Sequence, residues 1–242
     1  MQITQSEWDN YITLLRQVNE KAAFDIVSFC RSRFHIDGNN IVDLTDEQRK
    51  ELIDYAYGIV QKYGEGYAAL TAEMYDATAI LEGRYTNPAE IAELADYGDV
   101  ARSVNGTLKT SHNIEEIAGA ATRWVKMAGA DTTLKNAVRD GAEFAWIPHG
   151  ETCAFCLTLA SRGWQPASKQ IIKNGHAEHI HSNCDCQYAV RYDSNTRIEG
   201  YDPDKYYSMY RHADGRTPTE KINAMRREAY ADGNAETLID VN

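Results

Sequence analysis

Residues 45–81 read TDEQRKELIDYAYGIVQKYGEGYAALTAEMYDATAIL, and this stretch decides the fold class. Thr45 and Gln48 have the spacing of a capping box, in which two side chains bond each other's backbone N–H groups at the start of a helix. Gly64 and Gly66 mark where such a helix can kink. Apolar residues recur at intervals of three and four, which places them on one helix face: Leu52, Tyr55, Ile59, Tyr63, Leu70, Met74 and Leu81.

The same periodicity extends over most of the sequence on both sides of this stretch. Capping residues, or a proline suited to the first turn, mark the expected starts of further helices. These helices run from Ser6 to before His35, from Asn87-Pro88 onward, from Asn113 to about Ala128, from Thr132 to about Ala145, and from Thr217-Pro218 through Tyr230. The chain is therefore predicted to be mainly α.

Composition and charge exclude several classes of function. With 43% hydrophobic and 25% charged residues the chain resembles an ordinary globular protein. Its net charge is −11, and residues 1–148 carry most of it, with 14 basic and 23 acidic side chains. DNA contact is therefore not indicated by charge, because a broad acidic surface repels the phosphate backbone. No signal peptide and no run of 18 apolar residues is visible, so we expect no membrane association and synthesis in a cytosol.

Four of the five cysteines lie within residues 153–186. Cys153-Ala154-Phe155-Cys156 is a CxxC motif, and 24 residues later comes His181-Ser182-Asn183-Cys184-Asp185-Cys186, here called the knuckle. Clustered thiols in an intracellular chain favour metal binding, and Zn²⁺ is the commonest occupant of such a set. The alternatives are buried reduced cysteines or a labile disulfide, and Cys30 is expected to belong to the core.

Five residues compete for the four positions around a tetrahedral zinc ion. They are Cys153, Cys156, His181, Cys184 and Cys186. Either four thiols, or three thiols and His181, fill the set, and the choice stays open. Because a Cys-rich set has no open coordination position, the zinc is expected to be structural rather than catalytic.

The sequence pattern changes at Trp146. Helical periodicity ends there, and the next regular pattern is a strand-like run at residues 187–192. We therefore expect a helical body at 1–145, a zinc-binding Cys/His module at 146–197, and a tyrosine-rich tail with a C-terminal helix at 198–242. Close-set tyrosines in this tail either form a partner interface or cover the zinc module: Tyr201, Tyr206, Tyr207 and Tyr210.

Two enzyme patterns are only partly matched. His176-Ala177-Glu178 is similar to the zinc deaminase motif, but the CxxC comes before it rather than after it. Glu178-His179-Ile180-His181 resembles the start of an HNH nuclease, yet no second CxxC follows Cys186. No catalytic residue is therefore predicted, and the alternative function is a metal-dependent, HNH-like nuclease that uses His179 and His181.

Three segments together resemble the C-terminal signature of tailed-phage minor head proteins of the Mu F-like type. They are Pro148–Cys156, Leu159–Gly163 and His181–Cys186. Further segments are similar to the siphophage minor capsid branch of these head-morphogenesis proteins: Tyr63–Leu70, Arg139–Ala142 and Gly200–Asp204. The signature is the specific part of the resemblance, which covers most of the chain.

The resemblance implies a structural minor capsid protein of the virion, placed inside the phage head near the portal after synthesis in the bacterial host cytoplasm. It implies a role in head morphogenesis or DNA delivery, with the portal protein and other head proteins as partners, and a homo-oligomer is compatible with it. Proteins of this type are not generally enzymes.

Overall fold

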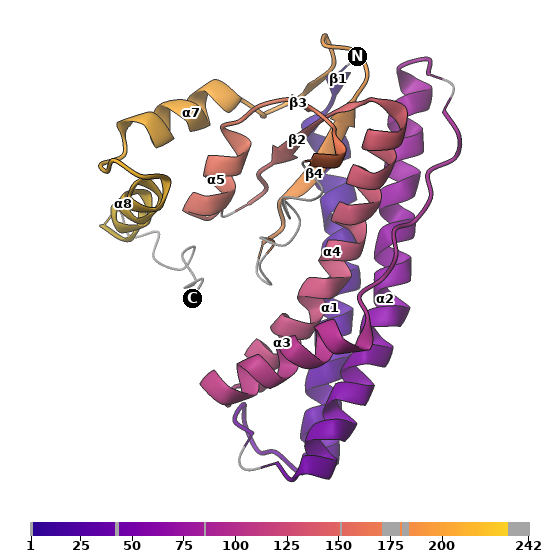
Figure 1. Ribbon diagram of the computed structural model, residues 1–242, viewed down its shortest axis with the longest axis vertical. Coiled ribbons are helices and arrows are strands. Elements are labelled where there is room, and N and C mark those ends of the chain that lie inside the picture. Colours follow the sequence, from indigo (N-terminus) through magenta and orange to yellow (C-terminus); the bar gives the residue numbers. More distant parts are fainter. Residues whose placement is uncertain are drawn as a thin grey trace.

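The computed structural model describes residues 2–41, 44–84, 86–150, 152–170, 180 and 184–231, apart from the side chains of 229–231. Three long helices form a bundle: α1 (Gln5–Phe34), α2 (Asp46–Leu81) and α4 (Ile114–Asp140), with α3 (Tyr97–Thr110) packed across it (Figure 1). Leu15, Ile26, Leu52 and Val125 are among the fully buried side chains of its core. The mainly α fold is confirmed, and the part of the chain described contains seven helices.

Capping residues fix where the first two helices begin. The Thr45 hydroxyl accepts from the Gln48 N–H, and the Gln48 side chain accepts from the Thr45 N–H, as the capping box predicts. α2 is helical throughout, Gly64 and Gly66 included. The prediction of Ser6 as the cap of α1 is wrong, because Thr4 and Glu7 form a capping box there and Ser6 lies inside the first turn.

No helix begins at Asn87-Pro88, and that prediction is wrong. Residues 86–96, here called the strap, are irregular, and α3 begins at Tyr97 with Asp96 as its cap. The strap's backbone N–H groups are taken by side chains from distant parts of the chain. Ala89 donates to Asp76 on α2 at 2.9 Å, while Glu90 and Ala92 donate at 3.0 Å to the side chains of Asn136 and Thr132 on α4.

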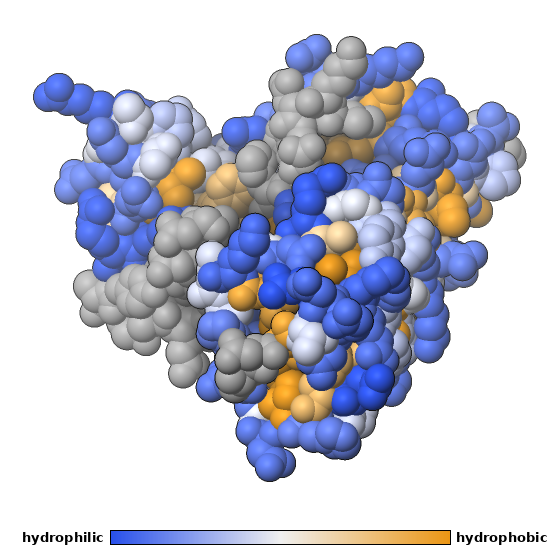
Figure 2. Space-filling view, turned by 60° about the horizontal axis from the view of Figure 1, so that its bottom comes forward, coloured by the Kyte–Doolittle hydropathy of each residue, from blue (hydrophilic) through white to orange (hydrophobic). Residues whose placement is uncertain are grey.

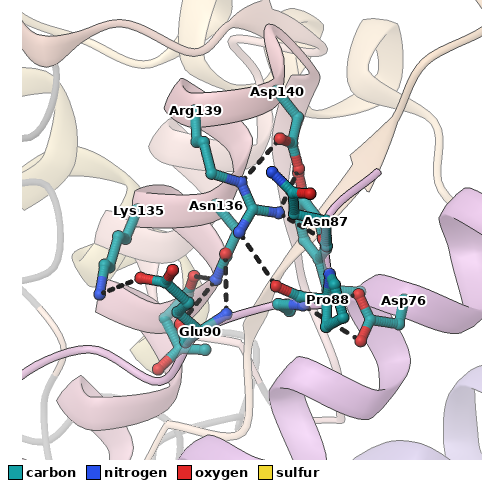
Figure 3. Close-up of polar contacts among 11 residues, drawn as sticks. Asp76, Asn87, Pro88, Glu90, Lys135, Asn136, Arg139 and Asp140 are labelled. Carbon is teal, nitrogen blue, oxygen red and sulfur yellow. Dashed lines mark hydrogen bonds and ion pairs between the residues drawn. The ribbon is translucent and has the colours of Figure 1, made fainter. Parts of the chain in front are cut away.

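The strap's carbonyl groups are also bonded by α4 (Figure 3). Asn136 Nδ2 donates to Glu90 O at 2.8 Å, and Lys135 Nζ donates to Ile91 O at 3.2 Å. The Arg139 guanidinium donates to the carbonyls of Asn87 and Pro88. Residues three or four apart lie on one helix face, so these side chains form a polar face of α4 that replaces the intrahelical bonds the strap lacks.

The two helices expected at Asn113–Ala128 and Thr132–Ala145 are one continuous helix, α4, so the predicted break is wrong. Gly129 causes no break because it has a packing role. A Cβ atom at this position would lie 2.6 Å from the Tyr67 ring and 2.7 Å from Thr71 Oγ1, both on α2. Gly129 therefore allows α2 and α4 to approach each other closely.

A small antiparallel sheet follows the bundle. Its strand order is β3 (Gln165–Pro166), β2 (Glu143–Ile147), β4 (Gln187–Arg191), with Trp146 opposite Tyr188. β4 confirms the predicted strand, whereas β2 occupies residues 143–145, which were expected to be helical. β2 also lies across the expected boundary at 145–146. A separate parallel pair joins β1 (Gln2–Ile3) to β5 (Arg197–Ile198).

Three shorter helices complete the described chain: α5 (Ala154–Ala160), α7 (Pro203–His212) and α8 (Pro218–Ala231). They gather on the side of the sheet away from α2 (Figure 1). The predicted capping of the last helix is confirmed, because Thr217 and Glu220 bond each other's backbone N–H groups. None of the described helices is both long enough and apolar enough to cross a membrane.

Candidate metal centre

The sulfur atoms of three cysteines lie close together beside α5. Cys156 lies in the first turn of α5, while Cys184 and Cys186 lie just before β4. Their Sγ atoms are all within 4.8 Å of one another, and those of Cys156 and Cys184 are 3.2 Å apart. The three residues are only 1%, 3% and 1% exposed. The structure therefore brings together three of the five predicted ligands in a buried cluster.

The geometry of this cluster fits a tetrahedral metal ion. Zinc–sulfur bonds of about 2.3 Å at tetrahedral angles separate the sulfur atoms by about 3.8 Å. The observed limit of 4.8 Å is close to that spacing, and thiolates are the ligands that zinc prefers in structural sites. The cluster could thus hold a metal ion with small adjustments of side-chain rotamers.

Cys153 lies at the edge of the cluster. It is the N-cap of α5, and its Sγ accepts a hydrogen bond from the Cys156 N–H at 3.4 Å. The CxxC motif is therefore a helix start, which places both cysteines at the N-terminal end of α5. Cys153 is 8% exposed and does not belong to the group of three mutually close sulfurs. His181 lies outside the described residues, so the fourth ligand stays a prediction.

The thiols differ in their tendency to ionise. Hydrogen bonds to Cys153, and then to Cys184 and Cys186, together with burial, raise the pKa of Cys156 well above its usual value. Burial also acts to raise the pKa of Cys186, but hydrogen bonds from Cys156, Cys184, the His149 backbone and Thr152 lower it well below its usual value. Of these two thiols, Cys186 therefore ionises more readily, and ionised thiols are the form that binds metal.

Two basic side chains of α4 support the knuckle and Ile180, which lies just before it. Lys126 Nζ donates to Cys184 O at 2.6 Å and lies 3.6 Å from Asp185 Oδ1, although the residue is only 3% exposed. Arg123 Nε donates to Ile180 O at 2.6 Å. Neither Lys126 nor Arg123 was predicted from the sequence to hold this segment in place. The signal for Lys126 was available, because it is a lone charge in the otherwise apolar run Trp124–Ala130.

The loop before α5 connects the centre to the bundle. The His149 backbone N–H donates to Cys186, and the His149 ring Nε2 lies 3.1 Å from Asp9 Oδ1 on α1. Thr152 Oγ1 lies 3.9 Å from Cys186 Sγ. The residues of the Pro148–Cys156 segment thus contact both the thiols and the first turns of α1.

The other candidate residues are placed as follows. Cys30 is fully buried in the core of the bundle, as predicted, and burial raises the pKa of its thiol to about 11. All five cysteines have free thiols, so the structure contains no disulfide between them. The deaminase-like His176 and Glu178 and the nuclease-like His179 lie outside the described residues.

Comparison with known families covers both the bundle and the metal centre. The model of the VG15 protein family matches residues 2–213, from β1 to the end of α7. The chain belongs to the VG15 protein family. No curated protein and no solved structure matches it. The family match therefore spans the bundle, the sheet and the thiol cluster, and among the described helices and strands only α8 lies beyond it.

Proposed function

We propose that this VG15 family protein is a structural minor head protein of a tailed phage, associated with the portal vertex and acting in head morphogenesis or DNA delivery. The observation that carries the proposal is the convergence of its three signature segments. The Pro148–Cys156 loop and the knuckle cysteines are far apart in sequence but meet at one buried thiol cluster, and Leu159 and Ala160 at the end of α5 belong to the same buried core. The signature that resembles Mu F-like proteins thus corresponds to a single structural centre.

Within this proposal the metal is Zn²⁺ and its role is structural. Cys153 and Cys156 are two of its four ligands, and the other two are drawn from His181, Cys184 and Cys186. Burial favours this role, because the three clustered thiols are at most 3% exposed and a catalytic ion needs a position open to substrate. Elemental analysis of protein purified without added metal should give one zinc per chain. Less than about 0.2 equivalents, with thiols paired as disulfides, would contradict a zinc site.

Exposed apolar side chains on α7 support partner binding through a helical surface. Tyr207 and Met209 are 51% and 44% exposed, whereas Tyr206 packs against the module that contains the thiols and Tyr210 packs beside α5. Tyr201 donates its hydroxyl proton to Ala160 O at 2.8 Å. Three of the four tail tyrosines thus pack onto the rest of the chain. Tyr207 is the one of these four described residues whose ring is exposed to a partner.

The remaining surface favours a protein partner over DNA. The face shown in Figure 2 is largely hydrophilic, with apolar residues gathered in small separate patches. Residues 1–148 carry nine more acidic than basic side chains, so duplex DNA would be repelled rather than bound by counterion release. A head protein that contacts α7 through apolar side chains avoids this repulsion.

Co-expression with the portal protein of the same phage, followed by pull-down, tests the proposal. The Tyr207→Ala/Met209→Ala variant should lose at least tenfold in recovered portal. Phe24→Ala, which removes a similarly exposed aromatic ring from α1, is the matched control and should recover portal normally. Normal recovery of the portal with the α7 variant would contradict the proposal that α7 contacts the portal.

Two other outcomes would overturn the proposal itself. In the first, the protein ignores the portal but binds duplex DNA at physiological salt, with an affinity that falls steeply as salt rises. In the second, purified protein cleaves plasmid DNA when a divalent ion is added, and the His179→Ala/His181→Ala variant does not. The second result would establish the nuclease alternative.

A further inference from the structure

Lys126 places a positive charge inside the molecule, beside the thiol cluster. It is the one charged residue in the run Trp124–Ala130 of α4, and its side chain is only 4% exposed. A lysine near the surface usually extends its ammonium group into water, but this one is covered by protein. Because the burial of an unpaired charge is costly, a buried ammonium group needs negative charge close by.

The contacts of Lys126 lead into the knuckle. Its Nζ donates to the Cys184 carbonyl oxygen at 2.6 Å and lies 3.6 Å from Asp185 Oδ1. Within one cysteine the carbonyl oxygen and the sulfur are at most about 5 Å apart, so Nζ lies within about 8 Å of the Cys184 sulfur. Both residues are only 3% exposed, and water screens charges at buried positions poorly.

Asp185 does not fully account for the charge of Lys126. Their separation of 3.6 Å is longer than a hydrogen bond, and the Asp185 side chain is 30% exposed. Water therefore competes for the Asp185 carboxylate, as it does in other partly exposed ion pairs. Cys184 and Cys186 are on either side of Asp185 in the sequence and are buried, so ionised sulfur atoms are a second source of negative charge near Nζ.

Metal binding would supply this second source. Cysteines bind metal as thiolates, whereas free thiols are neutral. Two positive charges on a zinc ion against three or four thiolates leave the bound set with a net negative charge, whichever of the two ligand sets is correct. A cation fixed beside the cluster therefore stabilises the metal-bound state relative to the metal-free state, and burial strengthens this interaction.

We propose that Lys126 is the counter-cation of the metal centre, and that its charge, beyond its hydrogen bond to the Cys184 carbonyl, raises the affinity for zinc. The inference rests on the structural zinc of the proposed function. Lys126 is not a ligand, because an ammonium group has no lone pair to offer. It acts through the cysteines, and groups outside the ligand set typically change metal affinity by about 10–100-fold.

Asp185 gives the proposal a test of sign. If Lys126 acts by its charge, then Asp185, which partly compensates that charge, should weaken metal binding. Asp185→Asn should therefore bind zinc at least about threefold more tightly than the wild type. If the ion pair between Lys126 and Asp185 only holds the knuckle in place, loss of either partner should weaken zinc binding. The two explanations thus predict opposite effects for one nearly isosteric change.

Competition between the zinc-loaded full-length protein and a chelator measures these affinities. Lys126→Met removes the charge from a side chain of similar length and should weaken zinc binding at least tenfold, and Lys126→Arg, which keeps the charge, should lose less. Lys135→Met is the matched control and should bind zinc like the wild type. Lys135 also lies on α4 but is 47% exposed and about 13 Å further along its axis, beyond the reach of a screened charge.

Cobalt(II) in place of zinc shows whether the ligands themselves have changed, because its absorption bands shift when a thiolate is lost. The cobalt spectrum should be the same in the wild type, Lys126→Met and Asp185→Asn. If a Lys126 variant fails to fold, Asp185→Asn decides the question alone.

Three results would overturn the inference: wild-type zinc affinity in Lys126→Met, equal or weaker zinc binding by Asp185→Asn, or a changed cobalt spectrum in Lys126→Met. A wild-type protein that holds no zinc would refute the zinc site of the proposed function, and this inference with it. A wild type that holds zinc, with variants that fail these expectations, would refute the role of Lys126 alone.

Discussion

The strap and the knuckle both lie against α4, but they are held there in different ways. At the strap, α4 supplies side-chain bonds to backbone groups from Asn87 to Ala92, and no thiol is involved. At the knuckle, Lys126 bonds the Cys184 carbonyl, Arg123 bonds the carbonyl of Ile180 just before it, and the knuckle's two cysteines converge with Cys156 on a buried point. One helix thus supports one irregular segment through polar side-chain contacts and another segment that we propose depends on an ion.

Metal removal should produce the largest difference between the knuckle and the strap. Binding energy at a structural zinc is folding energy, on the order of 10 kcal/mol in small finger peptides. After chelation we expect residues 146–197 to lose amide protection while α1, α2, α4 and the strap keep theirs, as measured by hydrogen exchange. Equal protection everywhere after zinc removal, or simultaneous loss in the strap, would contradict the division.

Asn136→Ala should damage the strap and leave the knuckle in place. Asn136 is fully buried, and its amide both donates to Glu90 O and accepts from the Glu90 N–H. Unpaired buried groups cost about 1–3 kcal/mol each, so we expect the free energy of unfolding to fall by about 3 kcal/mol. Urea denaturation measures it.

Lys135→Ala is the control for this experiment. Lys135 contacts the same strap at Ile91 O but is about half exposed, so its loss should cost less than about 1 kcal/mol. Zinc content should stay unchanged in both variants. Similar losses for the two variants would show that the buried amide has no special role.

Gly129→Ala tests how far both docked segments rely on the contact between α4 and α2. The added methyl group would meet the Tyr67 ring, and overpacking of this kind costs about 1–3 kcal/mol. The gain in helix propensity offsets up to about 1 kcal/mol, so we expect a net loss of about 1–2 kcal/mol in thermal or chemical unfolding. Gly106→Ala on α3, where nothing lies within 4 Å, should instead be neutral or stabilising.

Lowering the pH should weaken the attachment of the strap, because it protonates Asp140. This is the smallest of the expected effects. Hydrogen bonds from Arg139 lower the pKa of Asp140 from 3.8, burial opposes them, and Tyr75 adds a further bond. A lowered folded-state pKa means that this stabilisation is present above the unfolded pKa and is lost as pH falls through the folded value. Arg139 also bonds the strap at Asn87 and Pro88, so the two effects are coupled.

Asp140→Asn should therefore cost about 1 kcal/mol near neutral pH, and the difference from the wild type should shrink below about pH 3.8. Unfolding curves for both proteins between pH 6 and pH 3 give the comparison. A constant difference across this range would show that the ionised carboxylate is not what matters.

Local signals predicted the parts of the fold that depend on neighbours in sequence. The capping boxes at Thr45 and Thr217 and the strand at 187–191 each involve residues only a few positions apart, whereas the helix that begins at the CxxC motif was not predicted. Pro88 did not mark a helix start, because the strap is held by residues about 40 positions later in the sequence. These partners are Thr132 and Asn136 on α4. Distant partners of this kind leave no periodic mark in the segment that they hold.

The candidate site shows the same limit. The clustering of thiols predicted Cys156, Cys184 and Cys186 correctly as neighbours, because residue type alone restricts what such a cluster can do. Lys126 and His149 could not be assigned in this way. Their roles depend on where α4 and α1 lie relative to the knuckle, and that placement is set by the packing of the whole bundle.

The β1–β5 pair has a consequence for how the protein is made. Ile3 pairs with Ile198, so β1 has no partner until nearly two hundred residues have left the ribosome. The bundle can form earlier from contacts within the first 140 residues, whereas closure of this pair is a late, long-range step and is slow for that reason. A pocket lined by Gln5 and Glu199 comes into existence only with that closure. A chain released before this point would therefore carry the helices of the bundle but not this pocket.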